Sequence, residues 1–147
     1  MKKTGKAMTA DEIGEFIERE TLIEIKKQLP ELSSSDKFIP YFQMHEFEAL
    51  LFSDPKILSE KLGVKQNRID DIVNKFSTPE DINDNPNTAP SKRLEKLCVT
   101  YSQNKTGYMK IIKGIEVAEV LGIELISEEC VHFRKWFERI INLSRNE

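Results

Sequence analysis

The residues best suited to chemistry stand together in "FIPYFQMHEFEALLFSDP", residues 38–55, where His45, Glu46 and Glu48 interrupt an apolar run. If a helix begins at His45, a rotation of about 100° per residue puts His45 and Glu48 on one face, where such a pair can bind a metal or share a proton. If a strand continues instead, Glu46 and Glu48 share one face and form a carboxylate pair of the kind that holds a divalent cation. Both geometries make His45, Glu46 and Glu48 candidate catalytic residues, with Glu46 and Glu48 as candidate metal ligands.

The same residues also fit a structural role. Acidic side chains in the first turn of a helix are stabilised by the positive end of the helix dipole, which suits Glu46 and Glu48, and His45 can cap that helix. Asp54, which precedes Pro55, is in the same way first a helix cap and only second a metal ligand. The spacing alone leaves the metal site and the helix start as alternatives.

A second candidate site is a phosphate-binding group made of Ser91, Lys92 and Arg93. These residues stand where we expect a helix to begin, and the free backbone N–H groups at a helix N-terminus attract phosphate. Two adjacent cations strengthen that attraction. The patch can be extended by three further lysines, Lys105, Lys110 and Lys113. The alternative is that Lys92 and Arg93 belong to a solvated helix face.

Short helices separated by turn residues are predicted for most of the chain. Thr9 and Glu12 fit a capping box at the start of the first helix, and Gly63 is expected to end another. Thr88 or Ser91 is expected to cap a helix that runs to residue 97. The other helices are predicted over residues 46–52, 56–62, 67–76 and 110–121, and after Ser127, which caps the last one.

Residues 38–44 have the aromatic and branched side chains of a strand, with Pro40 favouring an edge position. A lone strand leaves backbone groups unpaired, so it needs a partner. The partner can be residues 123–126, a second copy of the chain in a homodimer, or part of a larger protein. We therefore expect a single domain over residues 1–147 that is mainly α with one or two short strands.

Composition narrows the class of protein. The net charge of -3 and the pI of about 5.6 argue against a surface that is uniformly basic for nucleic acid, and they leave room for a local basic patch. No apolar run approaches the roughly 20 residues of a membrane span, so we expect a cytoplasmic protein without membrane contact. Cys98 and Cys130 fit no metal-binding spacing, and Cys130 with His132 lacks further ligands, so both cysteines are predicted to be structural.

Three stretches in one order, "FIPYFQMHEFEALLFSDP", "INDNPNTAPSKRLEKL" and "GIEVAEVLGIELISEECVHFRKWFERI", point to a family. Over residues 22–141 the chain resembles the C-terminal two thirds of an uncharacterised bacterial Toprim-like family, often encoded beside an AAA- or ABC-type ATPase. The resemblance implies the C-terminal part of an α/β Toprim-like domain. Because nothing before Thr21 matches the family's first acidic motifs, we expect an incomplete domain that lacks its first strands.

The resemblance implies a metal-dependent nuclease that acts in defence against phage with an ATPase partner. It places His45, Glu46 and Glu48 after the third strand of the Toprim sheet, and residues 91–93 in the family's basic segment. In such enzymes the acids of several strands jointly hold the Mg²⁺ that activates water. We therefore expect a component of a Mg²⁺-dependent nuclease that acts on nucleic acid or, as the alternative, a noncatalytic helical module that docks on the ATPase or dimerises.

Overall fold

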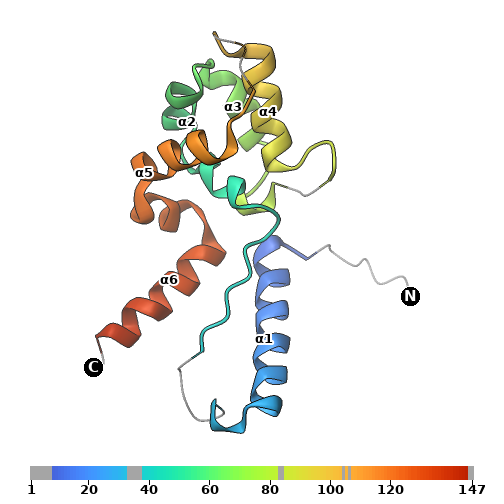
Figure 1. The fold of residues 1–147 in the computed structure, drawn as a ribbon, viewed down its shortest axis with the longest axis vertical. Coiled ribbons are helices and arrows are strands. Elements are labelled where there is room, and N and C mark those ends of the chain that lie inside the picture. The colour runs from blue at the N-terminus through green and yellow to red at the C-terminus, as the bar shows by residue number, and fades with distance from the viewer. Residues whose placement is uncertain (1–7, 33–37, 83–84, 104, 106, 146–147) are drawn as a thin grey trace.

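The computed structural model describes residues 8–32, 38–82, 85–103, 105 and 107–145. Its elements are α1 (Ala10–Gln28), η1 (Pro30–Leu32), η2 (Phe47–Ser53), α2 (Pro55–Leu62), α3 (Gln66–Val73), η3 (Pro79–Asp81), α4 (Pro90–Tyr101), α5 (Lys110–Glu129) and α6 (Val131–Ser144), where η marks a 3₁₀ helix. In Figure 1, α2, α3 and α4 gather at one end with the first part of α5, and α1 and α6 extend from the other. The described residues contain no strand, and the prediction of a mainly α chain is confirmed.

The hydrophobic core is organised around η2. All of its residues from 48 to 53 are buried, because its sequence FEALLFS is apolar on nearly every side and suits an element surrounded by others. Leu51 and Phe52 belong to one cluster with Leu58 of α2, Leu94 of α4 and Val117 of α5. The helix predicted over residues 46–52 is thus present one residue later, as a 3₁₀ helix.

The strand predicted over residues 38–44 is not found. The segment is extended and runs alongside α1 (Figure 1). The Phe42 N–H donates to Glu18 Oε1 of α1 at 2.7 Å, and the Tyr41 ring packs on Trp136 of α6 with 4.8 Å between ring centroids. Side chains of two helices therefore take the place of a neighbouring strand. The other predicted strand partner, residues 123–126, lies within α5.

Two helix ends follow the local signals in the sequence. Thr9 Oγ1 accepts a hydrogen bond from the Glu12 N–H at 3.2 Å, and Glu12 Oε2 accepts one from the Thr9 N–H at 2.8 Å, which confirms the predicted capping box. Asp54 caps α2 by accepting from two backbone N–H groups of its first turn. The same helix ends at Gly63, whose φ of 65° is the left-handed conformation that glycine favours.

Two predicted caps at helix starts are wrong. The N-cap of α4 is Ala89, between the two predicted caps Thr88 and Ser91. The predicted end of the 110–121 helix is confirmed, because Gly122 has non-helical dihedral angles, with φ of 70° and ψ of 164°, and marks a kink in α5. The helical residues after this kink run to Glu129 and α6 begins only at Val131, so Ser127 lies inside α5 and not at a helix start. No nearby residue caps α6, because its first N–H groups donate to the side chain of Glu80 in η3. Glu80 is distant in the sequence, so no local pattern predicts this start.

Candidate functional site

Glu46 and Ser91, predicted for two separate sites, meet in the structure. The Ser91 N–H donates to Glu46 Oε2 at 2.7 Å, and the Ser91 hydroxyl donates to Glu46 Oε1 at 3.0 Å. This N–H belongs to the first turn of α4, where a carboxylate is stabilised by free N–H groups and the helix dipole. Glu46 therefore occupies the position where a phosphate would bind at Ser91, and a phosphate there would have to displace it.

Glu48 is deeply buried, with only 1% of the residue exposed. Lys110 Nζ lies 2.9 Å from Glu48 Oε1, and Oε2 has no hydrogen-bond partner among the described residues. The contact with Glu48 raises the pKa of Lys110, since a carboxylate favours the protonated amine. The pKa of Tyr108 is also raised, by burial and then by the charge of Glu48. Lys110 thus supplies the positive charge that a metal ion would bring to Glu48.

His45 sits at the turn between the extended segment and η2, with a φ of 60° in the left-handed region. Within the described ranges, no group of three or more His, Cys, Asp or Glu residues is placed to hold a metal ion. Because Glu46 is bound to Ser91 and Lys110 lies against Glu48, a metal ion at these carboxylates would have to displace both partners. The binding of Mg²⁺ stays a prediction.

A cationic cavity of about 250 Å³, which we call the α3–α4 groove, lies between α3 and α4. It is lined by Arg68, Asp71, Ile72, Lys75, Arg93, Lys96, Leu97 and Tyr101. Four of these eight residues are cations and one is an acid, in a chain whose net charge is -3. In the part of the chain that the structure describes, none of the four cations forms an ion pair or a side-chain hydrogen bond.

Arg93 is the predicted phosphate-binding residue that lines this groove. Its guanidinium lies over the Phe76 ring, 5.3 Å from the ring centroid, and its Nε is buried without an acceptor among the described residues. Burial lowers the pKa of Arg93, because desolvation disfavours the charged form. A buried cationic N–H without an acceptor is unfavourable.

The cationic surface continues along α4. Lys92, the third predicted phosphate-binding residue, lines a neighbouring cavity of about 560 Å³. Lys96 lines both cavities and so connects them. Two lysines of the predicted extension have partners instead, since Lys110 lies against Glu48 and Lys113 pairs with Glu116 at 2.8 Å. The groove residues Arg68 and Tyr101 were not predicted, because the sequence does not show that α3 and α4 lie side by side.

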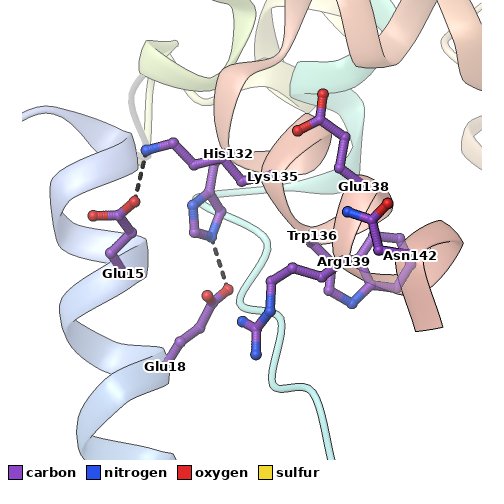
Figure 2. A pocket seen from close by; sticks show the side chains of 8 residues that line it. All are labelled: Glu15, Glu18, His132, Lys135, Trp136, Glu138, Arg139 and Asn142. Atoms are coloured by element: carbon purple, nitrogen blue, oxygen red, sulfur yellow. Dashed lines mark hydrogen bonds and ion pairs between the residues drawn. The ribbon is translucent and has the colours of Figure 1, made fainter. Parts of the chain in front are cut away.

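His132 on α6 forms a third cluster, beside a cavity of about 360 Å³ (Figure 2). It is 2% exposed, with Nε2 2.8 Å from Glu18 Oε1 and Nδ1 3.4 Å from Asp11 Oδ1. Lys135, one turn further along α6, bonds Asp11 at 2.7 Å and Glu15 at 2.6 Å. Because both ring nitrogens face carboxylates, His132 is not free to act as a base, and the cluster joins α6 to α1.

The sequence held one signal for this cluster. Asp11, Gly14 and Glu18 stand at positions i, i+3 and i+7 and therefore share one face of α1. The glycine leaves room for the imidazole, since a Cβ atom at Gly14 would lie 2.5 Å from His132 Nε2. The helical spacing places the two acids on either side of Gly14. It does not show that His132, which is far away in the sequence, packs against this glycine.

Glu80 of η3 holds the start of α6. It is 1% exposed, and its two carboxylate oxygens accept hydrogen bonds from the His132 N–H at 2.8 Å and the Phe133 N–H at 2.9 Å. Burial raises the pKa of Glu80, and the two backbone hydrogen bonds partly offset that shift. Glu80 therefore satisfies the N–H groups that a local cap would otherwise bind.

The described residues define a helical protein with a cationic groove and with carboxylates from distant elements that bind the starts of α4 and α6. The chain belongs to the DUF4276 family, whose description is a domain of unknown function, and the family model matches residues 4–141. The match thus includes α1, whereas the resemblance described above begins only at residue 22. No curated protein and no solved structure matches the chain. Among the described residues, no helix has the length and apolar character needed to cross a membrane.

Proposed function

We propose that this protein is the nucleic-acid-binding component of a nuclease system and holds backbone phosphates in the α3–α4 groove. The observation that supports this proposal is the gathering of Arg68, Lys75, Arg93 and Lys96 around one cavity, where none of the four forms an ion pair with a described residue. Unpaired cations in one concave surface are the arrangement that phosphate groups bind. Lys92 extends this surface along α4.

The test is direct binding of a labelled oligonucleotide, measured by fluorescence anisotropy over a range of salt concentrations. Lys96→Gln should weaken binding and reduce the slope of log K against log salt by about 1, the change expected for one lost phosphate contact. Lys26→Gln, on α1, removes the same charge away from the groove and should leave the slope unchanged. Equal effects of the two variants would overturn the groove as the binding site.

Catalysis by His45, Glu46 and Glu48 with Mg²⁺ is a separate proposal that rests on the Toprim-like resemblance. Glu48→Gln should abolish metal-dependent cleavage of nucleic acid by the protein with its ATPase partner and leave the circular dichroism spectrum unchanged. The same cleavage rate in the variant would remove Glu48 from the reaction. The groove proposal does not depend on this outcome, because it concerns binding alone.

The alternative function, a noncatalytic interaction module, is favoured by the exposed face of α5. Ile111 is 77% exposed, and Ile115 and Ile112 beside it are 54% and 50% exposed. Exposed apolar residues that lie together mark surfaces for protein partners. Since residues 38–44 form no strand, a homodimer or an ATPase contact would use such a face rather than strand pairing. Light scattering of the protein and of Ile115→Glu, with and without the ATPase, tests this: equal masses throughout would exclude it.

A further inference from the structure

The α3–α4 groove has features that phosphate binding alone does not need. Ile72 and Leu97 give it an apolar wall, and Tyr101, which also lines it, is 42% exposed. The Arg68 guanidinium lies over the Tyr101 ring at 4.6 Å from the ring centroid. Nucleobases stack on aromatic rings and on arginine planes. The groove therefore offers a flat, partly apolar surface together with its cations.

Asp71 is the second unusual feature. It lines the same cavity, and no hydrogen bond or ion pair engages its carboxylate within the described residues. A carboxylate repels a phosphate, so a site for phosphate alone would not be expected to contain Asp71. It can instead accept a hydrogen bond from the exocyclic amine of a base, as acidic side chains do with cytosine.

Resting on the proposed function, we propose that the groove takes an unpaired base of a single-stranded nucleic acid, with the base against Tyr101 and Arg68 and the neighbouring phosphates on the cations. A cavity of about 250 Å³ has room for one base and none for a duplex. In a duplex the bases are stacked and paired, so only its phosphates could reach the cations. A single strand can present both groups at once.

The experiment compares four labelled ligands by fluorescence anisotropy: a DNA strand, the RNA strand of the same sequence, the DNA duplex, and the DNA strand with abasic residues in place of its bases. We expect a single strand to bind at least about tenfold more tightly than the duplex, the effect of one stacked base. Abasic residues should remove this advantage. Tighter binding of either the DNA or the RNA strand than of the duplex supports the inference. The strand that binds more tightly shows whether the site prefers deoxyribose or ribose.

Variants separate stacking from charge. Tyr101→Leu should weaken single-strand binding about tenfold and leave the affinity for the abasic strand unchanged, whereas Tyr101→Phe should keep full affinity. The matched control is Phe16→Leu on α1. This substitution removes another exposed aromatic ring that has an arginine guanidinium, that of Arg19, lying over it. Asp71→Asn should shift the preference among bases, because it adds a hydrogen-bond donor.

Two failures are distinguishable. If duplex and single strand bind equally and Tyr101→Leu has no effect while Lys96→Gln still weakens binding, the base site is wrong and the phosphate groove stands. If none of the four ligands binds, both proposals fail.

Discussion

The contact between Gly14 and His132 gives the sharpest test of how α1 and α6 are held together. In Gly14→Ala the new methyl group would lie 2.5 Å from His132 Nε2 and 2.6 Å from Cε1. The imidazole cannot simply swing away, because it is 2% exposed and stacked on the Tyr41 ring, with 5.5 Å between ring centroids. We therefore expect the substitution to force the ring off its bond to Glu18.

The magnitude follows from three terms. Overpacking a buried site costs about 1–3 kcal/mol, and losing a hydrogen bond to a charged group costs about 1.5–3 kcal/mol. Replacing glycine by alanine inside a helix returns about 1 kcal/mol. The free energy of unfolding should therefore fall by about 1.5–5 kcal/mol. A helix-propensity argument alone predicts the opposite sign, so the direction of the change is decisive.

The assay is urea unfolding followed by circular dichroism, with Thr21→Ala at an exposed position of α1 as the control for helix propensity. His132→Ala removes the ring that the new methyl group meets. In that background Gly14→Ala should no longer destabilise the protein, and the difference between the two backgrounds measures the contact. A stabilising effect of Gly14→Ala in the wild type, or an equal loss in both backgrounds, would refute the reasoning.

Four further predictions concern fully and partly buried groups. Glu80→Ala should lower the free energy of unfolding by about 2–4 kcal/mol because it leaves two N–H groups of α6 without an acceptor, and Glu80→Gln, which keeps one carbonyl oxygen, should lose less in the same urea titration. Glu46→Ala should cost about 1 kcal/mol through the lost cap of α4, and an unchanged urea midpoint would contradict this. Burial raises the pKa of Cys98 and raises that of Cys130 to about 12, so neither thiol should react with a disulfide reagent at pH 8 unless the protein is denatured. Because the unfolded thiols ionise near pH 9 and the folded ones only above it, the thermal midpoint should fall as the pH rises from about 9 to 12.

Local signals predicted local structure well. The capping box of Thr9 and Glu12, the Asp54 cap and the Gly63 stop each depend on residues a few positions apart, and all three are present. Residues 38–44 show where such signals fail. Their aromatic and branched side chains favour a strand, yet the side chain of Glu18 and the rings of α6 bind them as an extended segment.

The candidate sites depend on contacts that no local pattern contains. Glu46 and Ser91 are 45 positions apart, and His132 lies 114 positions from Glu18. Glu46 and Ser91 were singled out from the sequence as candidate site residues, but their contact with each other was not predicted. Arg93 was likewise only partly predictable. The sequence shows its charge, whereas only the fold shows that it lies beside α3.

The aromatic cluster around Trp136 has a practical consequence for spectroscopy. Trp136 is the one tryptophan of the chain, and its ring packs on Tyr41 and Phe133 at the α6 end of the molecule, away from α3 and α4 (Figure 1). Its fluorescence emission therefore reports on that end, whereas the far-ultraviolet signal averages over all helices. If both signals change at the same temperature on heating, the two ends melt as one cooperative unit. If the emission changes first, the junction of α1 and α6 opens while the groove end keeps its helices.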